Sequence, residues 1–155
     1  MTAEIITIGD ELLIGQVINT NQAFIASELS KIGIRTERMT TVRDSQDEIL
    51  RALQESWTRS DVVLTTGGLG PTHDDVTKRA ICAFFETDMV SNLMVRQQIA
   101  SLLEARRMEW TTTAEEQTMV PRNATLLLNP VGTAPGLVME RDGRTVIVLP
   151  GVCLL

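Results

Sequence analysis

Apolar residues recur along this chain with two different spacings, one typical of helices and one typical of strands. Ile25, Leu29 and Ile32 follow the spacing i, i+4, i+7, which predicts an amphipathic helix over residues 21–32. Short runs of β-branched and other apolar residues predict strands. These runs lie at residues 3–8, 36–42, 62–66 and 125–128.

Three further helices follow from the same kind of pattern. Ser45, with Glu48 three residues later, matches a capping box and predicts that a helix begins there. The apolar face of this helix would consist of Ile49 or Leu50, together with Leu53 and Trp57, and would be buried. The other two helices are predicted after the glycine-rich turn that follows residue 66 and over residues 92–107.

Predicted strands and helices alternate, which is typical of α/β proteins. Residues 137–139 and 146–149 flank Asp142-Gly143, which predicts a hairpin. We therefore expect an α/β fold with a mostly parallel sheet that helices cover on both faces. The loops GDELL, TTGGLGPT and NPVGTAPG each follow a predicted strand, so they should meet at the carboxyl edge of the sheet, where such sheets bind ligands.

Composition narrows the classes of partner. A chain of 155 residues with 43% hydrophobic residues fits one globular domain. The net charge of -6 disfavours binding to nucleic acid or to an anionic membrane, and 3% aromatic residues without Tyr disfavour a base-stacking surface. No stretch resembles a signal peptide or a membrane span, so the expected location is the cytoplasm.

The most informative stretch is TTGGLGPTHDDVTKRA, which begins at residue 65. Gly67, Gly68 and Gly70 would let the backbone approach a phosphate and point its N–H groups toward it. The hydroxyl groups of Thr66 and Thr72 could donate to the same phosphate or simply cap the turn. The stretch matches neither a P-loop nor G-x-G-x-x-G, which disfavours an ATP-driven motor and an NAD dehydrogenase. The alternative is a tight turn without a ligand.

Carboxylates surround this turn in the predicted topology. Asp74 and Asp75 begin the next helix, and Asp10, Glu11 and Asp44 follow other strands. Acids at a helix start often serve only as caps or dipole partners. Several carboxylates at one edge would repel one another and a phosphate unless a cation lay between them. Oxygen ligands favour a hard divalent metal, with Mg²⁺ or Mn²⁺ first and Co²⁺ possible.

Several motifs, in this order, resemble the N-terminal domain of the CinA (competence/damage-inducible) family: IGDELLIGQVINTNQAFIASEL, VRDSQDEILRAL, VVLTTGGLGPTHDDVTKRA, LLLNPVGTAPG and VLPGV. More distantly they resemble the molybdopterin-binding domain of MogA, MoaB and MoeA. The resemblance implies a three-layer α/β/α sandwich that assembles as a homo-oligomer, a dimer or a trimer. Family members normally continue beyond LPGV, so we expect residues 1–155 to form a single domain that lacks those later segments.

The resemblance also implies roles for individual residues. Asp44 and Asp75 match the acidic pair of the MogA-type site and are the catalytic candidates. Asp10 and Glu11 match the GDE signature of the CinA branch and are, with Asp75, the metal candidates. The phosphate-binding candidates are the residues of two glycine-bearing loops: Thr66, Gly67, Gly68, Gly70, Thr72, Gly132 and Thr133.

Three functional hypotheses remain, of which the first two follow from the resemblance. The leading hypothesis is a metal-dependent nucleotide pyrophosphatase that hydrolyses ADP-ribose to AMP and ribose 5-phosphate. The first alternative is a molybdopterin-binding module of molybdenum-cofactor biosynthesis. The second is an oligomerisation or regulatory domain without catalysis. In the first two cases the partner is a small nucleotide or pterin ligand.

Overall fold

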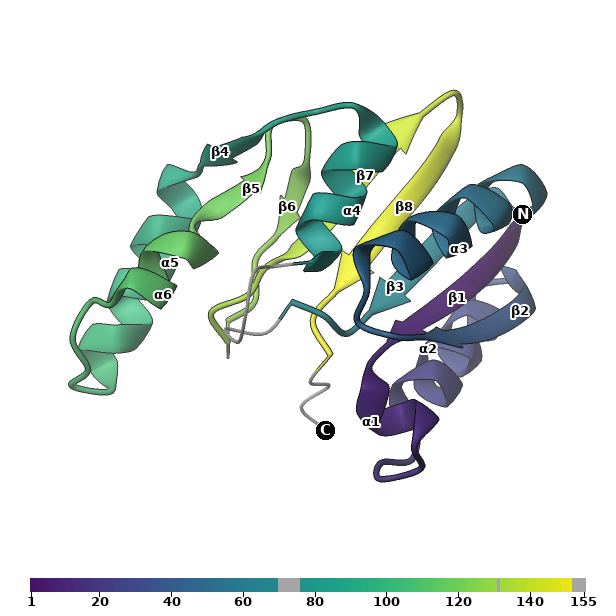
Figure 1. Ribbon diagram of the computed structural model, residues 1–155, viewed down its shortest axis with the longest axis horizontal. Coiled ribbons are helices and arrows are strands. Elements are labelled where there is room, and N and C mark those ends of the chain that lie inside the picture. Colours follow the sequence, from purple (N-terminus) through teal and green to yellow (C-terminus); the bar gives the residue numbers. More distant parts are fainter. Residues whose placement is uncertain (70–75, 131, 152–155) are drawn as a thin grey trace.

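The computed structural model describes residues 1–69, 76–130 and 132–151. Gly70, Thr72 and Asp75, with their neighbours His73 and Asp74, lie outside the described residues. Figure 1 shows the arrangement of the elements. The helices are α1 (Asp10–Leu13), α2 (Thr20–Lys31), α3 (Gln46–Arg59), α4 (Val76–Phe85), α5 (Leu93–Ala105) and α6 (Thr112–Gln117). The strands are β1 (Thr2–Ile8), β2 (Arg35–Val42), β3 (Val62–Thr66), β4 (Met89–Ser91), β5 (Met119–Pro121), β6 (Thr125–Leu127), β7 (Gly136–Arg141) and β8 (Arg144–Leu149).

A six-stranded sheet forms the middle layer of the molecule. Its strand order is β2-β1-β3-β8-β7-β6. The pairs of β1 with β2, β1 with β3, and β3 with β8 are parallel, whereas β7 pairs antiparallel with both β8 and β6. The prediction of an α/β fold with a mostly parallel sheet is confirmed. The sheet also has an antiparallel part, which β7 forms with its neighbours β6 and β8.

Helices cover both faces of the sheet, as predicted. In Figure 1, α3 and α4 lie in front of the sheet and α2 lies behind it. The side chains of β1 alternate accordingly. Ile6 and Ile8 belong to the larger apolar cluster with residues of α3 and α4, whereas Ala3 and Ile5 pack with Ile25 of α2. Burial of these apolar faces is the main source of stability. Among the described residues, no helix has the length and apolar character needed to cross a membrane.

The charged side chain of Glu4 lies within this apolar packing. Glu4 of β1 is only 1% exposed. Its carboxylate accepts hydrogen bonds from Arg59 (Nε at 2.8 Å, Nη2 at 2.9 Å) and from Ser56 Oγ (2.8 Å), both on α3. The hydrogen bonds from Arg59 outweigh desolvation and, with Ser56, hold the pKa of Glu4 below its ordinary value. The pair therefore ties β1 to α3.

A smaller unit lies beside the sheet, where α5 and α6 pack against the antiparallel pair β4-β5 (Figure 1). Arg96 of α5 donates to both carboxylate oxygens of Glu115 of α6, at 2.6 and 2.8 Å. Trp110 stacks on the Arg96 guanidinium at 4.8 Å and donates Nε1–H to the same carboxylate. These three side chains join α5 to α6.

The local predictions had mixed outcomes. The strand over 62–66 and the Asp142-Gly143 hairpin are confirmed, with both turn residues at positive φ (53° and 75°) as a type I′ turn requires. The hydrogen bonds predicted for the capping box are wrong. Ser45 does occupy the N-cap of α3, but its side chain makes no capping bond, and Glu48 instead accepts from the Arg43 amide at 3.3 Å.

Candidate functional site

The ends of three parallel strands define one edge of the sheet. The arrowheads of β1, β3 and β8 point to the same edge in Figure 1. The register agrees, because Thr7 of β1 pairs with Thr66 of β3, and Thr66 pairs with Leu149 of β8. Strand β6 runs in the same direction as β8, since each is antiparallel to β7. The loops after β1, β3 and β6 therefore lie at the carboxyl edge, as predicted.

Gly67 allows two strand ends to approach each other closely. Its φ is +101°, and a Cβ atom there would collide with the carbonyl oxygen of Ile8. A Cβ on Gly151, just beyond β8, would lie 2.9 Å from Gly67 Cα. The turn after β3 is thus packed against β1 on one side and against the chain after β8 on the other. Only glycine fits these two positions without a shift of the backbone.

The amide of Gly67 is already used within the protein. It donates to the carbonyl oxygen of Leu149 at 3.3 Å. The expectation that successive amides of the turn all face a ligand is therefore wrong for this residue. Gly68 also has a positive φ, of +68°, and a Cβ there would collide with the hydroxyl of Thr77 in α4.

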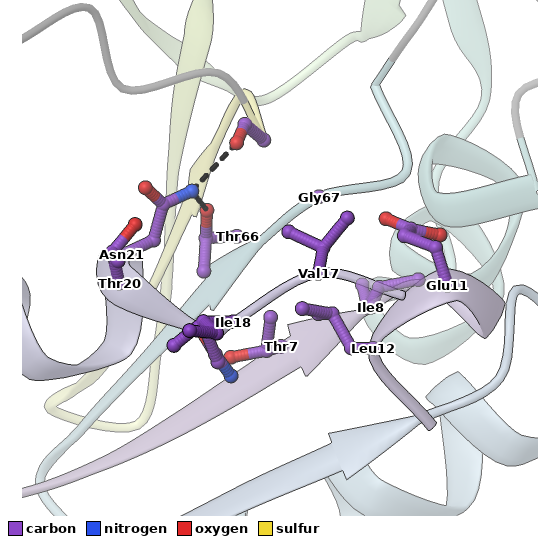
Figure 2. A pocket seen from close by; sticks show the side chains of 12 residues that line it. Thr7, Ile8, Glu11, Leu12, Val17, Ile18, Thr20, Asn21, Thr66 and Gly67 are labelled. Carbon is purple, nitrogen blue, oxygen red and sulfur yellow. Dashed lines mark hydrogen bonds between the residues drawn. The ribbon is translucent and has the colours of Figure 1, made fainter. Parts of the chain in front are cut away.

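A cavity of about 260 Å³ opens beside this turn, between the ends of β1 and β3 and the segment that leads into α2 (Figure 2). In Figure 2, Asn21 and Thr66 lie on one side of the cavity, and Val17, Leu12 and Glu11 lie on the other. The cavity is lined by Thr7, Ile8, Glu11, Leu12, Val17, Ile18, Asn19, Thr20, Asn21, Thr66, Gly67 and Gly151. Its walls therefore combine hydroxyl and amide groups with aliphatic side chains.

Asn21 fixes the polar wall. Its side-chain amide donates to the Gly151 carbonyl at 2.6 Å and to Thr66 Oγ1 at 3.4 Å. The Thr66 hydroxyl donates in turn to the Pro150 carbonyl at 3.4 Å. The first turn of α2, with Asn19 as N-cap, also lines the cavity and brings the positive end of a helix toward it. Thr66 and Asn21 are thus held by the protein itself.

The predicted acidic residues separate into two hollows. Glu11 lines the cavity, whereas Asp10 and Asp44 line a neighbouring open cleft together with Glu48 and Arg43. Successive residues of a helix point about 100° apart, so α1 directs Asp10 and Glu11 to different places. Among residues 1–69, 76–130 and 132–151, no three acidic, histidine or cysteine side chains lie close enough to hold a metal ion. The predicted metal set is therefore not assembled by the described residues alone.

The loop after β6 carries the remaining phosphate-binding candidates. The Gly132 carbonyl accepts from the side-chain amide of Gln98 in α5 at 3.3 Å, and the same amide donates to the Asn129 carbonyl. Asn129 donates across the loop to Ala134 at 3.2 Å. Gly132 and Thr133 do not line the cavity, and their role in phosphate binding stays a prediction.

Sequence reasoning did not single out Thr7, which contributes to the floor of the cavity. In a buried strand one threonine between isoleucines gives no signal of a site. The strand register reveals the position of Thr7, because it places this residue between Thr41 of β2 and Thr66 of β3 on the α2 face of the sheet. The hydrogen bonds of Asn21 show that it supports the cavity wall.

Comparison with known proteins places this geometry in a family. A family model described as a probable molybdopterin binding domain matches residues 4–154. A CinA-like protein of Cytophaga hutchinsonii is 45% identical over 150 residues, which are 97% of this chain and 36% of that protein. The chain thus spans little more than a third of the curated relatives that it matches, at 36% and 37% of their length.

Solved structures agree with the sequence matches. The crystal structure of the protein CinA from Thermoplasma acidophilum superposes with a TM-score of 0.85 and 36% identity, covering 97% of this chain and 88% of that one. The tungsten cofactor synthesizing protein MoaB from Pyrococcus furiosus superposes with a TM-score of 0.60 and 25% identity, covering 97% and 82%.

Proposed function

The chain belongs to the molybdopterin-binding domain family, as a CinA-like member, and from this premise we propose that it binds a phosphate-bearing pterin or nucleotide at the carboxyl edge of its sheet. The observation that carries the proposal is the cavity at the ends of β1 and β3, beside the glycine turn. Ligands of open α/β sheets occupy this edge. The family description names a pterin ligand, so a pterin with a phosphate group is the first candidate.

The chemistry of the cavity supports a ligand with two different ends. Aliphatic side chains and uncharged polar groups suit a heterocyclic ring, and a cavity of about 260 Å³ has room for one. Gly68, next to the cavity-lining Gly67, lies against Thr77 at the start of α4, and a phosphate group of the ligand would be accommodated near this helix N-terminus. The ligand would then extend along the strand ends.

Calorimetric titration of the 155-residue chain tests this function. We expect saturable binding of 6-hydroxymethylpterin phosphate or of ADP-ribose, with one site per chain. A matched variant, Arg144→Gln, changes a charge at the opposite edge of the sheet and should leave the affinity unchanged. If neither compound binds at millimolar concentration, the proposed function is wrong.

A second candidate function is hydrolysis of the ADP-ribose pyrophosphate with a divalent metal. The observation that favours it is the cleft in which Asp10 and Asp44 lie together, next to the cavity that Glu11 lines. These all-oxygen donors fit Mg²⁺ or Mn²⁺ in their chemistry. Asp75 would have to complete the set, because the described residues assemble no three-ligand group. A bound metal would neutralise charge on the pyrophosphate and activate water.

The hydrolytic function has its own test. Release of AMP from ADP-ribose should require added Mg²⁺, Mn²⁺ or Co²⁺ and should stop with EDTA. Asp44→Asn should lower turnover at least tenfold while the affinity for ADP-ribose stays within threefold. Binding of ADP-ribose without any release of AMP, at every metal tested, would leave the chain as a binding module.

A further inference from the structure

We propose that the Thr7 hydroxyl recognises the heterocyclic ring of the ligand by a hydrogen bond to its polar edge. This inference rests on the proposed function and assigns a specificity-determining residue to the same cavity. The starting observation is that Thr7 lines the cavity although its residue is only 3% exposed. The Thr7 side chain thus borders the space where a ligand would lie, and its hydroxyl oxygen is itself almost wholly buried beside that space.

The Thr7 hydroxyl has no hydrogen-bond partner among the described residues. Several other buried polar atoms share this property, but Thr7 is the one that lines the cavity. A buried hydroxyl without a partner has lost its hydrogen bonds to water and gained none in return, which destabilises the fold relative to an apolar group of the same shape. Such a group is usually explained by a partner that the protein chain does not itself supply.

Two polar side chains near Thr7 are already paired. Thr66, directly beside Thr7 in the sheet, donates to the Pro150 carbonyl, and Asn21 donates to Gly151. Among the described lining residues, the Thr7 hydroxyl is thus the side-chain group that is both buried and without a partner. It can donate one hydrogen bond and accept another.

The surroundings of Thr7 indicate which part of a ligand it meets. Aliphatic side chains of Leu12, Val17 and Ile18 line the same cavity, and the described lining residues include no lysine or arginine. A phosphate group would find no compensating charge from these side chains, and Glu11 would repel it. A flat, uncharged ring with nitrogen and oxygen atoms at its edge, such as a pterin or a purine, fits both the aliphatic and the hydroxyl surfaces.

Two valine substitutions test the inference as a matched pair. Thr7→Val and Thr65→Val each replace a buried, unpartnered hydroxyl by a methyl group, in neighbouring strands. Thr65 lies on the same face of β3 as Val63, which is the face opposite to that of Thr66, and it does not line the cavity. Each variant should raise the melting temperature of the ligand-free chain by about 2–4 °C, because an unpaired buried polar group is removed.

Binding should separate the two variants. Using whichever of 6-hydroxymethylpterin phosphate and ADP-ribose binds the wild-type chain, we expect Thr7→Val to weaken the affinity about tenfold to a hundredfold. Thr65→Val should bind like the wild type, and Thr7→Ser, which retains the hydroxyl, should stay within about threefold. Equal affinity of Thr7→Val and wild type would overturn the role of Thr7 alone. An equal loss in Thr65→Val would also overturn it, whereas no binding by the wild type would overturn the proposed function as well.

Discussion

At the scale of single residues, Gly67 shows how packing and a candidate site share one position. The sequence predicted a glycine turn with its amides facing a ligand. The structure uses the Gly67 amide for a bond to Leu149 and uses the missing side chain for the approach to Ile8. The glycine pattern therefore located the turn correctly, but it could not distinguish an amide that bonds to β8 from one that is open to a ligand.

A pair of alanine substitutions measures this close approach. Gly67→Ala and Gly33→Ala both place a side chain at positive φ (101° and 78°), but a Cβ at Gly33 would meet nothing within 4 Å. We expect Gly33→Ala to lower the free energy of unfolding by about 1 kcal/mol and Gly67→Ala by about 3 kcal/mol or more. Urea denaturation measures both. Equal losses would show that the strand ends are not packed as tightly as described.

Other residues of the site could not be predicted because their roles depend on register. Thr7 acquires its place only when β1 lies between β2 and β3. Asp10 and Glu11 were interpreted as one acidic group, and the helical geometry of α1 sends them to different hollows. Sequence spacing describes neighbours along the chain, and here the helix separates adjacent side chains.

At the scale of elements, the predictions that succeeded came from a continuous apolar run, as in β3, or from an apolar spacing repeated over several helical turns, as in α3. The strand over 62–66 and the stripe of α3 were predicted with their inward residues Ile49, Leu53 and Trp57. The short elements α1, β4, β5 and α6 were not predicted. The helices α1 and α6 have four and six residues, which is too few for a repeated helical spacing, and the strands β4 and β5 have three residues each, which is too few for a clear apolar run. Tertiary contacts, such as the Arg96–Glu115 pair, hold them instead.

The link between β1 and α3 should make stability depend on pH. The folded-state pKa of Glu4 is lowered, so its contribution is fully present above the unfolded value of about 4.3 and is lost as the pH falls through that value toward the folded pKa. At pH 7 we expect Glu4→Gln to lower the free energy of unfolding by about 1–3 kcal/mol. Because Arg59 is about a third exposed, with a side-chain value of 35%, water compensates part of the loss.

The difference between wild type and Glu4→Gln isolates this carboxylate from the other acids. Urea denaturation at several pH values should show that the difference shrinks as the pH falls from 5 toward 3. Glu28→Gln, whose carboxylate is exposed and pairs only with Lys31 in the described part of the chain, is the control and should show a small difference throughout. A difference that stays constant or grows on acidification would contradict the lowered pKa of Glu4.

At the far edge of the sheet, Arg141 joins the β7-β8 hairpin to α4. Its guanidinium lies 4.8 to 5.5 Å from the ring centroids of Trp57, Phe84 and Phe85, and it donates to the Phe84 carbonyl at 2.9 Å. Arg141→Ala should lower the free energy of unfolding by about 2–3 kcal/mol through loss of the cation–π contacts and the hydrogen bond. Arg141→Lys should lose about half as much. Thermal denaturation measures both, and an unchanged melting temperature in Arg141→Ala would show that the hairpin does not depend on this contact.

At the scale of the whole molecule, the general rule for open α/β sheets correctly located the cavity. Alternating strands and helices predicted the three layers, and three loops predicted the carboxyl edge as the site. The identity of the ligand could not be predicted, because it depends on the walls of the cavity and not on the topology. The metal requirement, the cytoplasmic location and self-association stay predictions.

The most direct test of the account is to map a bound ligand on the chain in solution. Amide proton and nitrogen shifts of the ¹⁵N-labelled chain can be followed during titration with 6-hydroxymethylpterin phosphate or ADP-ribose. We expect the largest changes at Thr7, Asn21, Thr66 and Gly67, with none at the Asp142-Gly143 hairpin on the opposite edge. Changes centred on that hairpin, or no changes at saturating ligand, would contradict a binding site at the carboxyl edge of the sheet.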